Sequence, residues 1–168
     1  MTVVKDPSVG GSSGGSLTFG ATSVMGDGHR EVLDMRVATS ETGPVWNEFF
    51  AILVARGLTG VRPVTSDAHA GQVETIATNL SGAAWQRCRP HYVANLMSVT
   101  PKSMWAAVKA MLHSVYDQPD RPGVQAQFAR LVDYVHGKLP EVHNHLDAAR
   151  ADILAFTGFR RDVWTQIW

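Results

Sequence analysis

The sequence predicts an α/β fold, a mixed sheet with flanking helices, followed by an all-helical region. Short apolar runs alternate with helical patterns up to Cys88, as in sheets with crossover helices. Beyond Cys88, four prolines each precede a stretch of apolar residues at helical spacing. Within the first pattern, residues 61–67 form a short run with three β-branched residues that ends on an acid. The run therefore predicts a carboxylate at the carboxyl end of a strand.

Bulk composition limits the possible functions. The chain has 168 residues, of which 45% are hydrophobic, enough for one globular domain with a buried core. Its 15 Lys and Arg residues balance its 15 Asp and Glu residues, so no overall positive field draws the chain onto DNA. The single cysteine excludes an internal disulfide, and no apolar run is long enough to span a bilayer. We therefore expect a cytoplasmic protein.

The first part of the chain predicts a flexible segment and then a β-hairpin. Residues 7–15 are rich in Gly and Ser, so residues 1–15 are expected to be flexible. Residues 17–21 alternate between larger apolar and smaller or polar side chains, residues 26–28 supply a Gly-Asp-Gly turn, and residues 32–37 are expected to form the returning strand.

Helices and strands alternate after the hairpin. Pro44 fits a first helical position, and the apolar stripe behind it predicts a helix. The next strand leads to Asp67, although Pro63 removes a hydrogen-bond donor and is unusual in a central strand. A short helix near residues 73–80 and a strand at residues 84–88 complete the order β-β-α-β-α-β.

The remaining chain is expected to be helical, with three apolar stripes facing a core. The stripes run through Trp105, Val108, Leu112 and Val115; Val124, Phe128, Leu131, Val132 and Val135; and Val142, Leu146, Ala149 and Ile153. A last stripe, Val163, Trp164 and Ile167, is expected to be exposed and to favour low solubility or self-association.

Asp67 is the candidate catalytic residue and metal ligand. Phosphoryl transfer on DNA normally uses two divalent ions about 3.5–4 Å apart between several acids, so Asp67 would need partners. Glu74 follows at about two helical turns, and we expect no second carboxylate within bridging distance. Alternatively, Asp67 caps the following helix. His69 is expected either to lie on the surface or to orient a phosphate.

Cys88 and His91 have the spacing of a metal-ligand pair. Structural zinc needs four ligands, and His143 and His145 could join only through long-range folding, so zinc is the less favoured interpretation. Neighbouring parallel strands end at one edge of a sheet, so Asp67, Cys88 and His91 are expected to approach one another.

Four cations near these residues could contact a DNA backbone, although such scattered charges predict weak binding only. They are Arg87, Arg89, Lys102 and Lys109. Other site classes lack support. Residues 10–15 lack the strand and the Lys of a phosphate-binding loop, and Ser66 and Ser98 lack the context of a nucleophile elbow.

Several segments resemble the mutator-type bacterial insertion-sequence transposases, which carry an Asp-Asp-Glu triad on an RNase H-like fold. The resemblance extends over nearly the whole chain from about Ala21. Its most specific segments are residues 27–33 (DGHREVL), 65–71 (TSDAHAG) and 85–92 (WQRCRPHY). Further similar segments are residues 94–97 (ANLM), 112–119 (LHSVYDQP) and 163–168 (VWTQIW).

The resemblance implies a partial RNase H-like core at residues 16–91 and an all-α insertion at residues 92–168. It implies that Asp67 is the second acid of the triad and that Cys88 and His91 are the family's pair between that acid and the glutamate. The implied reaction is cleavage at transposon ends and joining to target DNA, with Mg²⁺ or Mn²⁺ as cofactor.

Two acids of the family pattern have no counterpart in the sequence. The first Asp belongs near Met1, and neither Asp6 nor Asp34 lies in a matching motif, whereas the Glu belongs beyond Trp168. The resemblance also implies amino-terminal DNA-binding helices, for which we expect no counterpart in this sequence. We therefore expect a truncated, inactive remnant that binds DNA weakly, with a first strand that is poorly formed or supplied by residues before Ser16.

Two alternatives remain open. The chain could be a non-catalytic fragment that binds or inhibits a full-length transposase, and co-purification would then reveal the complex. It could instead be an unrelated metal-dependent phosphohydrolase that uses Asp67 and His69, which requires a second acid beside them. Transposon-end and target DNA, a second copy or a full-length transposase are the expected partners, and no membrane contact is expected.

Overall fold

The computed structural model describes residues 2–5, 17–25 and 29–165, and the chain divides into two units. The first unit runs to Cys88, and the second spans Arg89–Trp164. The boundary expected between residues 91 and 92 falls inside helix α3 (Arg89–Ser98), the first helix of the second unit. No helix in the described part of the chain is long and apolar enough to cross a lipid bilayer.

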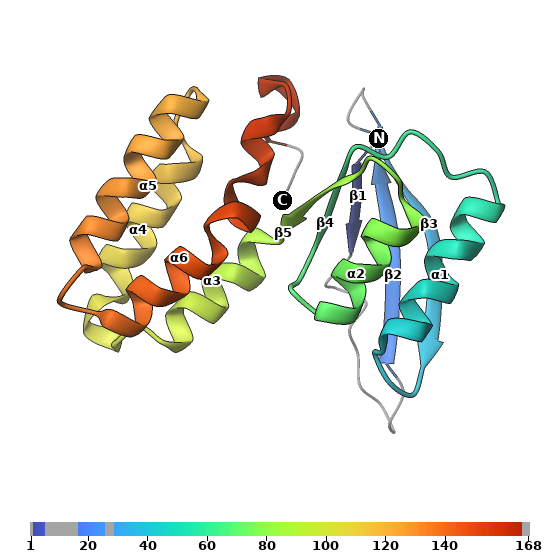
Figure 1. Ribbon diagram of the computed structural model, residues 1–168, viewed down its shortest axis with the longest axis horizontal. Coiled ribbons are helices and arrows are strands. Elements are labelled where there is room, and N and C mark those ends of the chain that lie inside the picture. The colour runs from blue at the N-terminus through green and yellow to red at the C-terminus, as the bar shows by residue number, and fades with distance from the viewer. Residues whose placement is uncertain (1, 6–16, 26–28, 166–168) are drawn as a thin grey trace. The chain divides into compact units, whose positions relative to one another are not determined.

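A five-stranded mixed sheet forms the base of the first unit (Figure 1). Its strands are β1 (Thr2–Lys5), β2 (Leu17–Val24), β3 (Arg30–Ala38), β4 (Pro63–Ser66) and β5 (Ala84–Arg87). They lie in the order β3-β2-β1-β4-β5. Strand β2 is antiparallel to both of its neighbours, whereas β1, β4 and β5 are parallel. The predicted α/β class, a mixed sheet with flanking helices, is confirmed.

Strand β1 shows that residues before Ser16 supply the first strand, which is one of the two options expected for it. It corrects the expectation that residues 1–15 form a flexible segment throughout. Thr2–Lys5 lies inside the sheet, with Val3 beside Val64 and Val4 beside Thr65 of β4. The β-branched residues at the start of the chain suit a strand between two neighbours. The Gly and Ser residues that follow are the feature that predicts flexibility. Residues 6–16 lie outside the described part of the chain.

Strands β2 and β3 form the predicted hairpin. Their antiparallel register runs from Leu17 beside Ala38 to Val24 beside Arg30, with one shift after Ala21. The Met25 amide donates to the His29 carbonyl oxygen at 2.9 Å and closes the pair. The predicted Gly-Asp-Gly turn at residues 26–28 is outside the described residues.

Helices α1 (Gly43–Ala55) and α2 (Ala70–Asn79) cover one face of the sheet (Figure 1). Pro44 occupies the first turn of α1, as predicted. The apolar stripe of α1 is buried with residues from β4 and α2: Trp46, Phe49, Phe50, Leu53, Val64 and Ile76. Pro63 is the first residue of β4, where a missing donor is tolerated, so this strand can lie between β1 and β5.

The first turns of α1 and α2 meet at two glycines, Gly43 and Gly71. A Cβ atom added to Gly71 would lie 2.9 Å from both the Cα and the N of Gly43, closer than real Cβ atoms come to backbone. A Cβ atom added to Gly43 would lie 3.7 Å from the Gly71 Cα, an ordinary contact. The contact therefore requires glycine at position 71 but not at position 43.

The second unit is helical, as predicted (Figure 1). After α3 come η2 (Lys102–Met104), α4 (Trp105–Tyr116), α5 (Arg121–Val135), α6 (Pro140–Leu154), η3 (Ala155–Gly158) and η4 (Arg161–Val163). The three predicted stripes form its core, with these members buried: Val108, Leu112, Val115, Val124, Phe128, Leu131, Val135, Val142, Leu146, Ala149 and Ile153. Trp105 departs from the prediction, because it starts α4 with 42% of its surface exposed.

Trp164 corrects the expectation of an exposed stripe near the end of the chain. Its side chain is 4% exposed, packs edge-on against Phe156 at 4.9 Å between ring centroids, and donates from Nε1 to the Phe159 carbonyl oxygen at 3.0 Å. Val163 is half-buried, and Ile167 is outside the described residues. The partner of Trp164 comes from the chain itself, so this indole gives no reason to expect self-association.

Arg89 is a buried cation in the second unit. Only 4% of its surface is exposed, and its Cζ lies 4.3 Å from the Tyr116 ring centroid and 4.5 Å from that of Phe156. Burial lowers the pKa of Arg89, while Tyr116 and Asp117 act in the opposite direction. A guanidinium keeps its proton in proteins, so a charged group links α3, α4 and η3 through two aromatic faces.

Replacing Gly71 by alanine is expected to destabilise the protein by about 1–2 kcal/mol. Overpacking a tight contact costs about 1–3 kcal/mol, which exceeds the gain of about 0.5–1 kcal/mol from removing a helical glycine. The matched variant Gly43→Ala should be neutral or slightly stabilising, because its added methyl fits. Urea unfolding followed by circular dichroism measures both. Equal stability of the two variants would contradict the close approach.

Replacing Arg89 by lysine is expected to lower the free energy of unfolding by about 2 kcal/mol or more. An ammonium cannot stack on two rings, and cation–π contacts are worth most when they are desolvated. Arg161→Lys is the matched control, because Arg161 lies 4.8 Å from the Trp164 ring centroid but is exposed. Its cost should stay within about 1 kcal/mol. Thermal unfolding that gives equal losses for both variants would refute the structural role of Arg89.

Candidate active site

Asp67 directly follows strand β4, which lies between the parallel strands β1 and β5. Because parallel strands end at the same edge of a sheet, Asp67 stands at the edge where open α/β sheets place their ligands. The residue is half-buried, and its Oδ1 atom is shielded from solvent. The structure thus has the carboxylate where the sequence predicted it.

The capping alternative for Asp67 is wrong. Helix α2 begins at Ala70, and its N-cap residue is His69. The amides of Gln72 and Val73 donate to the His69 carbonyl oxygen at 3.0 and 3.1 Å. Asp67 is two residues away from the cap position, so capping does not explain an acid at the end of this strand.

Ser66 and Trp85 hold the backbone that carries Asp67. The Trp85 Nε1 donates to Ser66 Oγ at 2.9 Å, and Ser66 Oγ donates to the Asp67 carbonyl oxygen at 2.9 Å. Ser66 is 1% exposed, so these bonds are shielded from competing water. The sequence alone did not predict this positioning pair. The signal that could have found it is that both residues lie in the segments most specific to the resemblance.

Cys88 lies at the same edge of the sheet. Its amide donates to the Ser66 carbonyl oxygen at 2.7 Å, which brings Cys88 next to the peptide between Ser66 and Asp67. The thiol side chain is buried, with 5% of the residue exposed. His91 belongs to α3 in the second unit, so its approach to Asp67 stays a prediction.

Three buried polar atoms near Asp67 in the sequence have no hydrogen-bond partner within the described ranges. They are Thr65 Oγ1, His69 Nδ1 and Gln72 Oε1. Buried polar groups are normally hydrogen-bonded, so atoms of this kind are satisfied by water, by an ion or ligand, or by further protein groups. The β4–α2 segment therefore offers donor and acceptor capacity in the same stretch of chain as Asp67.

Asp67 fits a divalent ion as a single ligand. Mg²⁺ is commonly held by one or two carboxylates, with water and substrate phosphates completing its shell. Residues 2–5, 17–25 and 29–165 contain no group of three or more His, Cys, Asp and Glu side chains that could hold a metal ion. Two bridged ions therefore do not fit these residues alone. Asp6 and Asp27 are outside the described residues, and Asp34 Oδ2 pairs with Arg56 at 3.3 Å.

The histidines considered for zinc make other contacts in the second unit. His143 Nε2 lies 3.8 Å from Asp147, and its ring packs on that of His136 at 5.0 Å. The His145 ring lies 5.3 Å from the ring of Tyr92. These contacts give no support to a zinc site with Cys88.

The four cations predicted to touch DNA lie in different surroundings. Arg87 ends β5 in the first unit and is half-buried. Lys102 and Lys109 are exposed and lie three residues before and four residues after the exposed Trp105. Arg89 is buried, which is at odds with a contact to a DNA backbone. The other three stay predicted contacts.

Comparison with known proteins gives the family. The model of the family described as Transposase, Mutator family, matches residues 9–168. The transposase for insertion sequence element IS1081 of Mycobacterium tuberculosis is 54% identical over 154 residues, which is 92% of this chain and 37% of that protein. The transposase for ISRM5 of Rhizobium meliloti is 30% identical over 136 residues, 81% of this chain and 34% of that protein.

A third relative, the transposase for IS256 in transposon Tn4001 of Staphylococcus aureus, is 30% identical over 116 residues, 68% of this chain and 30% of that protein. The chain thus spans 37% of the length of the mycobacterial relative. A match over residues 9–168, together with the acid at the end of β4, leads to one conclusion. The chain belongs to the Mutator family of insertion-sequence transposases.

Proposed function

We propose that this chain is the part of an insertion-sequence transposase that supplies one metal-binding acid, Asp67, to the site of DNA cleavage and strand transfer. The position of Asp67 at the carboxyl end of the parallel strand β4 carries the proposal. The identity of 54% to the mycobacterial transposase over 92% of the chain supports the same reaction class.

We further propose that the sheet is RNase H-like. Three parallel strands, β1, β4 and β5, carry the hairpin β2–β3 on one side, and α1 and α2 cover one face. This arrangement is the one expected for the family's catalytic core. The helical second unit then corresponds to the all-α insertion.

Within this proposal, the chain's own residues hold the acid in place. Divalent ions, when bound, stabilise charge on the attacking and leaving oxygens. Asp67 offers carboxylate oxygens, and the Ser66–Trp85 hydrogen bonds fix the peptide that carries them. Gly71 allows α2 to start close against α1, which sets the path of the segment between Asp67 and the helix. Together these contacts restrict where the Asp67 carboxylate can lie, and catalysis depends on such accurate placement.

DNA cleavage with two divalent ions requires further acids besides Asp67. They would come from residues outside the described ranges or from a full-length relative, so the described residues alone are not expected to cleave DNA. No observation favours the phosphohydrolase alternative, because the described ranges hold no cluster of Asp67 and His69 with a second acid that could hold a metal.

The substitution Asp67→Asn is expected to abolish transposition chemistry. The test replaces the matched segment of the mycobacterial transposase with this chain and measures excision of a plasmid-borne element that carries that transposase's ends. Asp67→Asn should reduce excision by more than about 100-fold, because even outer-shell partners of metal ligands are worth about 10–100-fold. Glu74→Gln, an exposed change on α2, is the control and should keep excision.

A second measurement keeps the Asp67 proposal testable if the chimaera proves inactive. Mn²⁺ titrated into the isotopically labelled chain should broaden the amide NMR signals of residues 66–69 first, and Asp67→Asn should remove this effect. Unchanged excision or unchanged broadening in the Asn variant would overturn the assignment of Asp67 as a metal ligand.

Removing the indole donor at Trp85 is expected to lower excision through misplacement of Asp67. Trp85→Phe keeps an aromatic ring but leaves Ser66 Oγ without its donor, so we expect a loss of about tenfold, at the low end for outer-shell groups. Trp105→Phe is the matched control, since Trp105 Nε1 also donates one bond, to the Thr100 carbonyl oxygen at 2.8 Å. Equal excision by the two variants in the same chimaera would show that the Trp85 bond does not position the acid.

A further inference from the structure

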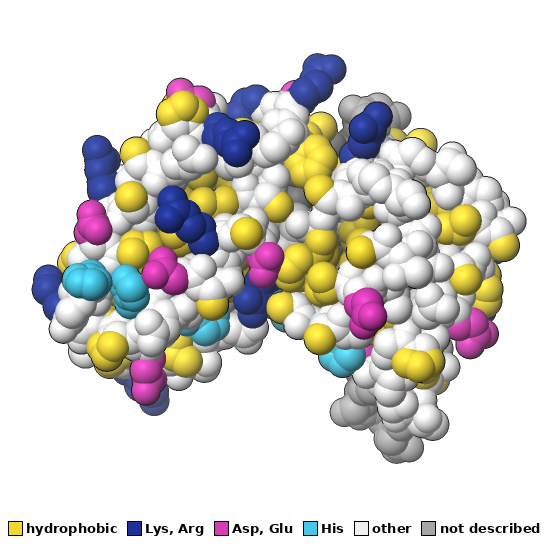
Figure 2. Space-filling model, in the orientation of Figure 1, with side chains coloured by type: hydrophobic (Ala, Val, Ile, Leu, Met, Phe, Trp, Pro, Cys, Tyr) yellow, Lys and Arg dark blue, Asp and Glu magenta, His cyan; other side chains and the backbone are white. Residues whose placement is uncertain are grey.

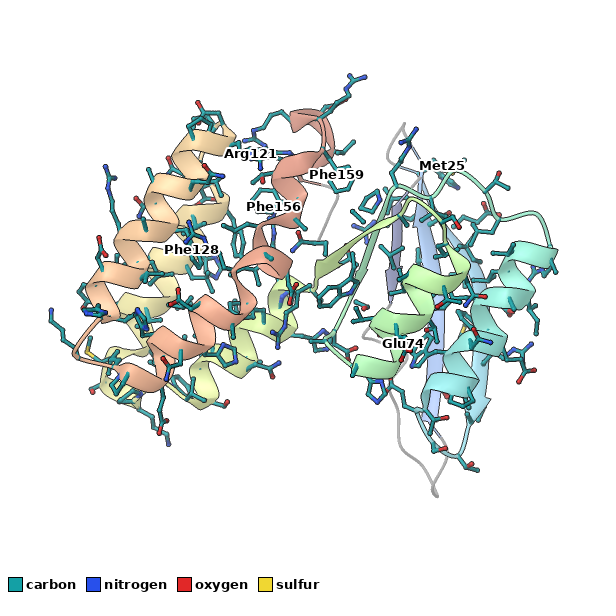
Figure 3. The ribbon with its side chains drawn as sticks, in the orientation of Figure 1. Met25, Glu74, Arg121, Phe128, Phe156 and Phe159 are labelled. Atoms are coloured by element: carbon teal, nitrogen blue, oxygen red, sulfur yellow. The ribbon has the colours of Figure 1, made fainter. Side chains whose placement is uncertain are left out.

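A groove of about 500 Å³ lies in the second unit between the start of α5, the last turns of α6 and η3. Its polar side chains are Arg121 and Gln125 from α5, Asp147 and Arg150 from α6, and Thr157 from η3. Four of these five side chains can donate hydrogen bonds, and two carry a positive charge. Figure 2 shows dark blue side chains over α5 and α6 on this face, and Figure 3 labels Arg121 beside them.

Arg121 and Arg150 differ from the other arginines of this unit. The others are buried or donate hydrogen bonds to protein groups: Arg89, Arg130, Arg160 and Arg161. Neither Arg121 nor Arg150 has a hydrogen bond or a carboxylate partner within the described residues, and the Arg150 Cζ lies only over the Phe128 ring, 5.4 Å from its centroid. Both residues are exposed, so their donors are available to a ligand.

The groove is lined by small side chains between these cations. Ala148, Ala151, Ala155 and Gly158 leave little bulk, and a Cβ atom added to Gly158 would meet nothing within 4 Å. Small residues permit close approach of an extended backbone. Alanine methyl groups suit the carbon face of a sugar, while guanidinium forks match phosphate oxygens in two-point contacts.

We propose that this groove binds the phosphodiester backbone of DNA, with Arg121 and Arg150 each contacting a phosphate and Gln125 and Thr157 donating between them. The inference rests on the proposed function in that DNA is the substrate of the chain, but it does not depend on Asp67. It gives the helical unit a DNA-binding surface separate from the four cations that the sequence singled out.

Charge and size favour a phosphate backbone over a protein partner. Protein interfaces draw most of their affinity from large buried anchors, and among the described residues that line the groove Leu154 is the one large apolar side chain. DNA binding by contrast depends on cations that neutralise phosphates and release counterions. Two guanidinium groups face one carboxylate in this described lining, that of Asp147, which leaves a local positive excess.

The test measures the affinity of the purified chain for a short labelled DNA duplex. Fluorescence anisotropy reports the binding at NaCl concentrations between about 50 and 200 mM. The double variant Arg121→Gln/Arg150→Gln should weaken binding at least about tenfold at the lowest salt. It should also reduce the slope of log K against log salt by about 1.8, because each lost phosphate contact removes about 0.9. Circular dichroism confirms that the variant is folded.

The matched control is Arg130→Gln/Lys138→Gln, which removes the same charge from exposed positions on α5 and just beyond it. It should change the affinity less than about twofold, since it removes no phosphate contact. Equal weakening by both double variants would overturn the proposal, because the effect would then reflect net charge. Absence of binding by the parent chain up to about 100 µM at low salt would overturn it too.

Two further arms distinguish DNA binding in the groove from binding of a protein partner and from metal binding at Asp67. In the first arm, a labelled acidic peptide competes with DNA for the chain. Tighter binding of the peptide, lost in the Arg121→Gln/Arg150→Gln variant, would show that the groove binds a protein partner and would refute the proposal. Asp67→Asn should bind DNA like the parent chain. Loss of DNA binding in the arginine variant with intact Mn²⁺ broadening at Asp67 would separate the groove from the metal site, so each proposal can fail independently.

Discussion

The contact between the first turns of α1 and α2 is the constraint on which the candidate site depends. Helix α2 starts within van der Waals distance of the Gly43 backbone, so there is no room for a side chain at position 71. Asp67 ends the strand only a few residues earlier, with its peptide fixed by Ser66 and Trp85. The segment between strand and helix is therefore fixed at both ends. A carboxylate on such a segment needs little ordering when it meets an ion or a substrate.

A buried cation has the corresponding role in the second unit. Burying a guanidinium costs free energy unless the surroundings compensate, and Arg89 is compensated by the faces of Tyr116 and Phe156. Both rings are themselves core residues, and Trp164 packs on Phe156 from the end of the unit. The start of α3, the end of α4 and the η3–η4 segment are thus tied to one charged group. Because Trp164 packs on Phe156, it is buried although it lies outside any α-helix.

The sequence allowed the elements to be predicted wherever one physical pattern dominated. Helical spacing identified the stripes of α4, α5 and α6, and β-branched residues identified the strand before Asp67. Prediction failed where composition and context disagreed. The Gly- and Ser-rich stretch predicted flexibility for residues 1–15 as a whole, so the sequence left open whether a first strand forms there. Pairing with β2 and β4 makes Thr2–Lys5 a strand. Burial of Arg89 was also unpredictable, because the aromatic partners are distant in sequence.

For the site, the sequence could locate Asp67 and Cys88 but not the hydrogen bonds that position them. Those bonds join β4 to β5 and exist only in the folded sheet. The same reasoning applies to charge. A formal net charge of +0 argues against a global attraction to DNA, yet it does not describe how cations are placed. Most arginines of the helical unit are occupied by protein partners, whereas Arg121 and Arg150 share one groove. Local arrangement, and not total charge, therefore decides where a neutral chain of this family can hold a phosphate backbone.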